Sequence, residues 1–452
     1  MLIGIVVGIG IFKTPPVVAA NVDSALAFIG LWAAGGLLTL VGALCYAELG
    51  TSRPHAGGEY HYLKEAYGDG LSFLFAWGRM TVIQTGAIAA VAFAYGDYAA
   101  AVVPFGSSGA ALHAAAAILV LSALQLAGTT SSGKLQLALT VAGVTAILIV
   151  AIAGFMAAPD LGPQGHANVT SDSGAAGLAL VFILLTYGGW NEAAYLSGEI
   201  RDVRRNMVRV LLIGTGIVTA LYLLINVALV LSVGLDGLRQ EKLVTEPVEK
   251  VLGTGGVLAV ALIVCVAALS TLNGTIFTGA RSMFALGRSY PLFGRLGDRN
   301  AGNGAPSTAI VLQAAIALSL VAFGATTRDG FTAMVEYTAP VFWMFMALIG
   351  LSLIVFRWRE PQRDLPFPVP LYPLTPIVFC ATALYLVHAS IAYTGVGALA
   401  GLAILASGVP VYLLARRSEI SAQAAAGGLS AAGRASGEVV GPPGFEPGTR
   451  RL

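Results

Sequence analysis

The sequence predicts an all-α membrane protein of about twelve transmembrane helices. We expect two inverted five-helix repeats with broken helices one and six, followed by two C-terminal helices. Three observations predict this fold class. Of the 452 residues, 57% are hydrophobic and only 11% are charged, whereas soluble domains carry about 25% charged residues. Apolar runs long enough to cross the hydrocarbon core, which takes about 20 residues in a helix, recur along the chain. The basic residues fall mostly in alternate loops, as the positive-inside rule expects.

The apolar runs follow one another with short connections and define the expected helices. Their approximate positions are 1–19, 25–49, 71–103, 110–127, 135–157, 175–198, 208–234, 255–286, 306–325, 331–356, 371–393 and 396–415. With a cytoplasmic N-terminus and alternating spans, most loop lysines and arginines fall inside. The outer loops then hold Arg239, Lys242, Lys250 and Arg328. This asymmetry predicts a multi-pass protein of the plasma (cell inner) membrane with both termini cytoplasmic.

The runs also divide the chain into parts. We expect a first inverted repeat over 1–157, a second over 175–356 and the last two helices over 371–417. From 418 to 452 the composition turns to Ala, Gly and Ser, which predicts a disordered tail. Two loops look structured: 53–70 as an interfacial segment on the inner side and 245–253 as a short outer helix. Because Met1 lies directly in the first apolar run, we expect an upstream start or a weakened inner gate.

Composition excludes several other kinds of protein. The net charge is only +2, and no part of the chain stands apart as a basic domain. We therefore expect no nucleic-acid partner. The three cysteines lie in apolar runs with no Cys/His cluster, so we expect no disulfide, metal or cofactor. The five histidines are scattered, and no paired acid and base indicates a membrane enzyme. A channel remains a rival, although no continuous polar path or filter is visible.

The first and sixth spans contain glycine clusters at similar depth. Gly4, Gly8 and Gly10 interrupt the first span, and Gly188 and Gly189 interrupt the sixth. Each glycine costs about 1 kcal/mol relative to alanine in a helix. Taken singly, each fits close helix packing. Taken together, breaks that open two inverted five-helix sets predict a midplane binding site, because non-helical backbone in a membrane must line a cavity or protein.

The two breaks also indicate the kind of ligand. Backbone N–H groups after the first break favour a carboxylate. Carbonyls before each break favour an ammonium. A small zwitterion or anion fits both, and Asn191 and Glu192, just after the second break, can then face a wet cavity.

Four stretches resemble a known family. "VVGIGIFKTP", beginning at Val6, is similar to the first helix of the amino acid–polyamine–organocation superfamily. "CYAELGTSRPHAGGEYHYLKEAYG" (45–68), "YGGWNEAAYLSGEIRDVRRN" (187–206) and "STLNGTIFTGARSMFALGR" (270–288) resemble its L-type amino acid transporter branch. The resemblance covers nearly all of 1–417. It implies the twelve-helix fold with two inverted repeats and a secondary transporter that takes up or exchanges amino acids.

The resemblance also implies roles for particular residues. Ile9 and Gly10 would offer backbone N–H groups to the substrate carboxylate, and Gly8 would open the turn. The ammonium would face the carbonyl groups of three residues, which are Val6, Leu185 and Gly188.

Three departures from the family pattern bear on mechanism. Ile9 stands where a serine is usual, so a hydroxyl contact is lost. Leu185 stands where an aromatic gate is frequent, which predicts a preference for neutral side chains with looser size control. Gly143 stands where many members have a lysine on the fifth helix, which leaves the coupling mechanism open.

Glu192 has two interpretations. A carboxylate near the midplane costs about 2.5–3.5 kcal/mol on translocon scales. It is therefore either a proton carrier that couples transport, because desolvation would raise its pKa, or a residue that pairs with an arginine or a hydroxyl.

Other polar residues are candidates for coupling or gating. Asn273 lies mid-span and is interpreted as an interhelical hydrogen-bonding residue or as part of a cation site. Glu199 and Arg281 are expected ion-pair partners at the inner face, and Glu48 and Arg53 are interpreted in the same way. Lys13 either lines the outer vestibule or extends outward along the helix.

The sequence thus predicts a secondary active transporter, a permease or exchanger, that moves amino acids across the membrane by alternating access. We expect neutral substrates and no covalent chemistry. The alternative is a channel, or a carrier for another small zwitterion or amine. The partners expected are the substrate and the lipid bilayer, and the question of a partner subunit is left open.

Overall fold

The computed structural model describes residues 8–55, 57–128, 133–158, 175–196, 202–240, 245–298, 300, 304–394 and 396–435. These residues form helices and connecting turns, with no strand among them. Ten helices in the described part are long and apolar enough to cross a membrane. Of the two remaining expected spans, the sixth is interrupted after Thr186, and the first is described only from residue 8 onward. The fold class expected from the sequence is therefore confirmed as an all-helical, multi-pass membrane protein.

The helices follow the expected spans closely. The first half of the chain forms α2 (Gly10–Ala19), α3 (Ala25–Ser52), α4 (Gly58–Tyr67), α5 (Asp69–Gly78), η1 (Arg79–Ile83), α6 (Gln84–Val102), η2 (Gly106–Ser108), α7 (Gly109–Leu126) and α8 (Gly133–Ala157). The second half forms α9 (Ala175–Thr186), η4 (Trp190–Glu192), α10 (Ala193–Leu196), α11 (Val203–Gln240), α12 (Glu246–Ser289), η5 (Pro291–Gly297), α13 (Ser307–Gly324), α14 (Gly330–Arg359), α15 (Leu374–Thr394) and α16 (Val396–Ala435).

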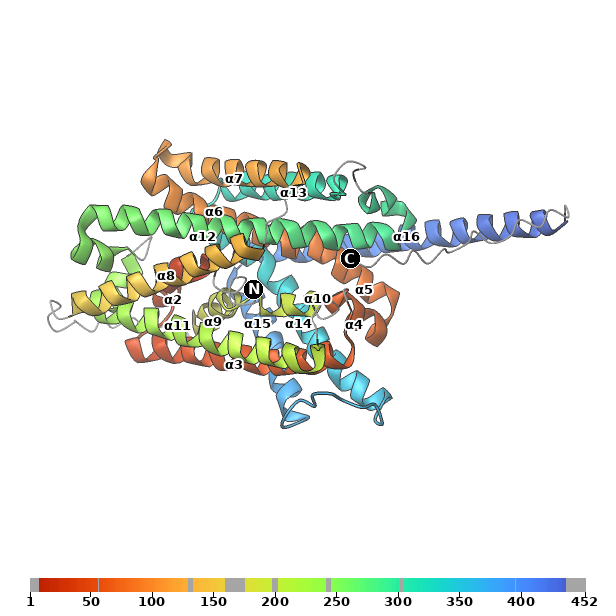
Figure 1. The fold of residues 1–452 in the computed structure, drawn as a ribbon, viewed down its shortest axis with the longest axis horizontal. Helices are drawn as coiled ribbons and strands as arrows, with labels where there is room; N and C mark the ends of the chain where they lie inside the picture. The colour runs from red at the N-terminus through yellow and green to blue at the C-terminus, as the bar shows by residue number, and fades with distance from the viewer. Residues whose placement is uncertain are drawn as a thin grey trace.

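The long helices lie side by side along the length of the molecule (Figure 1). α7 packs beside α13 at one edge, and α3 packs beside α11 at the other. The short helices α2 and α9 lie between these edges and contact each other, so both broken spans are enclosed by the bundle.

Small residues let these helices approach closely, as is common where the solvent is lipid. Gly96 on α6 faces α7 at such short range that a Cβ there would lie 2.1 Å from the carbonyl oxygen of Ala110. Polar caps fix some helix starts: Ser24 accepts from Ala27 N–H at 3.2 Å at the start of α3. Asp329 accepts from the Phe331 N–H at 2.9 Å at the start of α14.

Three spans are less regular than the sequence suggests. The third span is continuous from Asp69 to Val102 but includes the π-helical turn η1 in its middle. α11 and α12 each contain one glycine with positive φ, Gly234 (φ 68°) and Gly253 (φ 63°). The kink at Gly253 separates a short helix from the long one, which confirms the short helix expected over 245–253.

The C-terminal helix extends further than the sequence predicts. A disordered tail is expected from residue 418, but α16 continues to Ala435 and projects beyond the rest of the bundle (Figure 1). The stretch "ISAQAAAGGLSAAGRA" is rich in alanine, and alanine has the highest helix propensity of all residues. Low complexity was therefore a poor indicator of disorder up to that residue.

The ion pairs of Glu48 and Arg53 also differ from expectation. Glu48 accepts hydrogen bonds from Arg357 Nε at 2.8 Å and Nη2 at 2.6 Å, so α3 is bonded to α14. Arg53 pairs instead with Glu65 and, at 2.8 Å, with Glu360. Glu48 and Arg53 are close in sequence, but their side chains point in different directions. Each therefore pairs with a residue of another segment.

Candidate substrate-binding cavity

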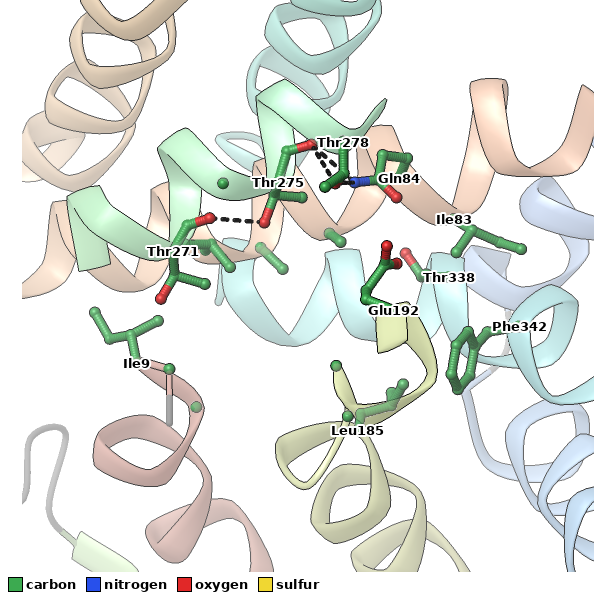
Figure 2. Close-up of a pocket in the computed structure, with 18 of the residues that line it drawn as sticks. Ile9, Ile83, Gln84, Leu185, Glu192, Thr271, Thr275, Thr278, Thr338 and Phe342 are labelled. Carbon is green, nitrogen blue, oxygen red and sulfur yellow. Dashed lines mark hydrogen bonds between the residues drawn. The ribbon is translucent and has the colours of Figure 1, made fainter. Parts of the chain in front are cut away.

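A cavity of about 560 Å³ lies at the level of the two helix breaks. Its lining is mostly apolar, with a polar band on α12 and α6 (Figure 2). Among its lining residues are Gly8, Ile9, Gly10, Gln84, Leu185, Gly188, Asn191, Glu192, Thr271, Thr275, Thr278, Thr338 and Phe342.

The expected first break lies at the start of α2, and the structure describes its residues from Gly8 onward. Ile9 precedes the helix without any side-chain cap, and the Phe12 N–H donates to the Ile9 carbonyl at 3.0 Å. A helix has no internal acceptors for its first N–H groups. Because Gly8, Ile9 and Gly10 line the cavity, the start of α2 directs a positive dipole end and N–H donors to that side.

The second break follows α9. The Gly188 N–H donates to the Leu185 carbonyl at 3.0 Å, and Gly189 then adopts a left-handed conformation with φ 101°. Residues with a Cβ rarely adopt this conformation. The chain re-enters a helix through η4 and α10. The Leu185 carbonyl keeps a second lone pair, so it can accept from a ligand as well as from Gly188.

Hydroxyl groups connect the two breaks. Thr14 on α2 and Thr186 on α9 are joined by an Oγ1–Oγ1 hydrogen bond of 2.7 Å. Thr186 donates to the Phe182 carbonyl at 2.8 Å, so Thr14 is the donor between the two threonines. Tyr98 on α6 donates to the Phe12 carbonyl at 2.9 Å. These bonds fix both broken helices against the third span.

A buried ion-pair cluster lies on the η4 side of the cavity. Arg79 Nη2 donates to both oxygens of Glu192, at 2.8 and 3.0 Å. Arg79 Nη1 donates to Glu59 Oε2 at 3.3 Å, and Nε donates to Ser282 Oγ at 3.2 Å. The Arg79 side chain is 4% exposed and that of Glu192 is 17% exposed. Arg79 therefore joins η1 to α4, η4 and α12 from within the bundle.

Glu59, on α4 outside the membrane spans, is surrounded by donors. Tyr46 Oη donates at 2.6 Å, Tyr195 Oη at 2.9 Å and Asn191 Nδ2 at 3.0 Å, in addition to Arg79. Burial raises the pKa of the Glu59 carboxyl, and Arg79 opposes that rise. Four donors around one carboxylate favour its ionised form, which only accepts hydrogen bonds.

A second ion pair involves Lys13, in the first half of α2. Lys13 Nζ is 2.6 Å from Asp97 Oδ2 on α6 and 4.0 Å from Asp329 Oδ2 at the start of α14. The Lys13 side chain is only 9% exposed. It therefore neither lines an open vestibule nor extends outward, and it fastens α2 to two neighbouring helices.

The structure brings most of the sequence-predicted residues together. Eight of them line the cavity: Gly8, Ile9, Gly10, Leu185, Gly188, Asn191, Glu192 and Asn273. Arg281 does not line it, and its guanidinium lies 4.2 Å from the centre of the Phe277 ring. Val6 and Glu199 lie outside the described residues, as does any pairing of Glu199 with Arg281.

Sequence reasoning missed Arg79, Glu59 and Gln84. An arginine inside an apolar span is a functional candidate by default, and Arg79 gave that signal. Glu59 gave none, because it lies in a polar loop segment that the fold happens to bury. Gln84 also gave no distinct signal among the apolar residues of its span.

Comparison with known proteins places the chain in a family. The family model for amino acid permeases matches residues 1–414. The b(0,+)-type amino acid transporter 1 of Mus musculus is 30% identical over 400 residues, which are 86% of this chain and 80% of that protein. The large neutral amino acids transporter small subunit 2 of Homo sapiens is 30% identical over 432 residues, 92% of this chain and 78% of that protein. Because the matched residues include both breaks and the cavity, this multi-pass membrane protein belongs to the amino acid permease family.

Proposed function

We propose that this permease binds its amino acid in the cavity between the two helix breaks and moves it by alternating access. The observation that carries the proposal is the pairing of opposite polar groups at one cavity. The start of α2 directs N–H donors to it at Ile9 and Gly10, and the break at Leu185 and Gly188 supplies carbonyl acceptors. An α-amino acid presents a carboxylate and an ammonium on adjacent atoms, which matches this pairing.

The lining supports neutral side chains as substrates. Leu185, Ile83 and Phe342 line the cavity (Figure 2), and none of their side chains offers a polar contact. An apolar cavity stabilises an aliphatic or aromatic side chain by removing it from water, by about 25 cal/mol per Å² of buried apolar surface. No covalent step is needed for this activity, and we propose that the chain is a transporter without enzymatic activity.

The loop charges support the orientation. We propose that the protein lies in the plasma membrane with both termini cytoplasmic, because basic residues concentrate in the loops that this orientation places inside. Asp236, exposed near the outer end of α11, then faces the cell exterior. Asp236→Cys should react with a membrane-impermeant thiol reagent added to intact cells.

Reconstituted uptake tests the proposal. The full chain in proteoliposomes should take up radiolabelled amino acids, and unlabelled amino acid inside the vesicles should accelerate entry if the permease is an exchanger. Uptake that equals that of protein-free vesicles for every amino acid tested would overturn the proposal. Uptake of small amines without a carboxylate, at the same rate, would place the recognition elsewhere.

A further inference from the structure

α11 presents one continuous apolar stripe to the outside of the bundle. Its exposed side chains include Ile213 (60% exposed), Ile217 (42%), Leu224 (37%) and Leu231 (47%). They recur at spacings of four and seven residues, so they lie on one face of the helix. α11 lies at the edge of the molecule beside α3 (Figure 1). This face, which we call the α11 stripe, therefore contacts the acyl chains of the bilayer.

Two arginines continue the α11 stripe at the start of the helix. Arg205 and Arg209 are both exposed. At about 100° per residue, both lie within about 80° of Ile213 around the helix axis. Within the part of the chain that the structure describes, neither guanidinium has an ion pair or a side-chain hydrogen bond. The stripe thus ends in two positive charges that no described side chain neutralises.

The length of the α11 stripe places these arginines at the membrane surface. Val210, 40% exposed, begins the apolar part and Leu231 ends it. The rise between them is about 32 Å at 1.5 Å per residue, which matches a hydrocarbon core of about 30 Å. The helix is regular over this length, because its kink lies beyond it at Gly234. Arg205 and Arg209 precede Val210 and so lie at the level of the lipid headgroups.

The helix itself gains nothing from these charges. The start of a helix is the positive end of its dipole, which disfavours cations, and the first turn of α11 contains no acidic residue. Among the described neighbours, Asp202 precedes the helix and forms no ion pair with it. The end of α3 adjoins α11 where Gly50 meets Met207, but Glu48 there is bonded to Arg357. An anion from outside the chain would compensate the two arginines.

We propose that Arg205 and Arg209 bind the headgroup of an anionic phospholipid whose acyl chains lie along the α11 stripe. The two residues are one turn apart on one face, so both can contact one headgroup. Arginine also binds phosphate through two parallel N–H···O bonds. A lipid fits better than free phosphate because the apolar stripe begins directly beside the arginines. In the proposed orientation of the protein, this lipid belongs to the inner leaflet.

Titration of the purified full chain with two lipids tests the proposal. Native mass spectrometry in a neutral detergent gives the apparent Kd of the first lipid bound. Phosphatidylglycerol and phosphatidylcholine with the same acyl chains carry net charges of minus one and zero. Each arginine beside an anionic headgroup contributes roughly fivefold in affinity, so the Kd for phosphatidylglycerol should be lower by at least about tenfold. Inorganic phosphate at the same concentration should not displace it.

Variants at the start of α11 assign the preference to the stripe. Arg205→Gln and Arg209→Gln should each reduce the preference for phosphatidylglycerol by about fivefold, and the double variant should have almost none. Arg209→Lys keeps the charge and should keep most of the preference. Arg204→Gln is the matched control. Arg204 is exposed in the same turn but lies about half a turn away from Ile213 around the helix, so its loss should leave the preference unchanged.

Each outcome bears on one part of the proposal, and none depends on amino acid uptake. Equal Kd values for the two lipids in the wild-type protein overturn the anionic lipid site. A loss in Arg204→Gln as large as that in Arg209→Gln overturns the assignment to the stripe and indicates attraction by the basic surface as a whole. Displacement by inorganic phosphate overturns the lipid as the occupant. If the double variant does not fold, the wild-type comparison and the single variants still decide.

Discussion

Gly10 shows at the scale of one residue why the first break tolerates no side chain. A Cβ there would lie 3.2 Å from Thr186 Cγ2 and 3.3 Å from Thr186 Oγ1, while Thr186 is held by its own hydrogen bonds. A larger side chain would enter the space where the N–H groups of α2 face the cavity.

We predict that Gly10→Val abolishes amino acid uptake while the bundle stays folded. The β-branched side chain has little rotameric freedom and cannot turn away from Thr186. Radiolabelled uptake and thermal unfolding in detergent measure the two properties. Gly30→Val is the control, because a Cβ at Gly30 meets nothing within 4 Å. Normal uptake by Gly10→Val would remove the first break from the site.

Ile9 should be less sensitive than its neighbour. Its contribution is proposed to come from its backbone N–H, so Ile9→Ser changes only a side chain. We predict that the KM for amino acid uptake changes by less than about tenfold, the effect of roughly one hydrogen bond. A complete loss of uptake in Ile9→Ser would show that the buried Ile9 side chain holds the break in place.

The ion pair with Arg79 bears on the coupling role of Glu192. Of the two interpretations that the sequence allows, pairing with an arginine is the one that the geometry displays. We therefore expect Glu192→Gln to leave the pH dependence of leucine uptake unchanged, as measured with and without a proton gradient. If the pH dependence disappears while exchange at equal pH persists, Glu192 carries the coupling proton.

At the scale of one element, the sixth span depends on two glycines for different reasons. Gly189 adopts φ 101°, a left-handed conformation, whereas a Cβ at Gly188 would lie 2.8 Å from the Leu185 carbonyl oxygen. Together they let α9 end, turn and continue as η4 and α10 with the Leu185 carbonyl at the cavity.

We predict that Gly189→Ala lowers the free energy of unfolding by about 1–2 kcal/mol, the strain of a left-handed residue that carries a Cβ. Gly216→Ala on α11 is the matched control, because its Cβ meets nothing within 4 Å and alanine favours a helix. Thermal unfolding of both variants gives the comparison. A Gly189→Ala protein as stable as Gly216→Ala would contradict the assigned conformation.

At the scale of the whole molecule, two ion pairs hold the broken helices to the third span. Arg79, in η1, binds Glu192, three positions after Gly189, and Asp97, on α6, binds Lys13, three positions after Gly10. One pair lies after each break, and both use the same continuous helix. Movement of either half-helix relative to the third span would break its pair.

We predict that Lys13→Asp greatly reduces uptake, because it leaves three carboxylates close together around α2. Adding Asp97→Lys should restore part of the activity by exchanging the two charges. Asp69→Asn, at an exposed pair with Lys64, should have no effect, since exposed ion pairs contribute little. Uptake rates in proteoliposomes decide the matter, and a double variant no better than the single one would contradict a direct pairing.

The sequence by itself determined the membrane class, the approximate spans and the two breaks. These properties are local: the transfer of an apolar run to lipid depends on its own composition, and a glycine loosens the helix that contains it. The residues expected at the breaks, such as Gly10 and Gly188, therefore line the cavity as placed from sequence alone. The extension of α16 to Ala435 shows the limit of composition, because alanine suits both low complexity and helix.

Only the tertiary structure decided which charges meet. Arg79 lies 113 positions from Glu192 and Glu48 lies 309 positions from Arg357, and no local pattern relates such residues. A buried charge must find a partner because water is absent, but helix packing determines which partner lies within reach. For the same reason the hydrogen bonds of Gln84 to Thr275 and Thr278 on α12 could not be read from sequence. The direction of each hydroxyl depends on neighbours that only the folded bundle supplies.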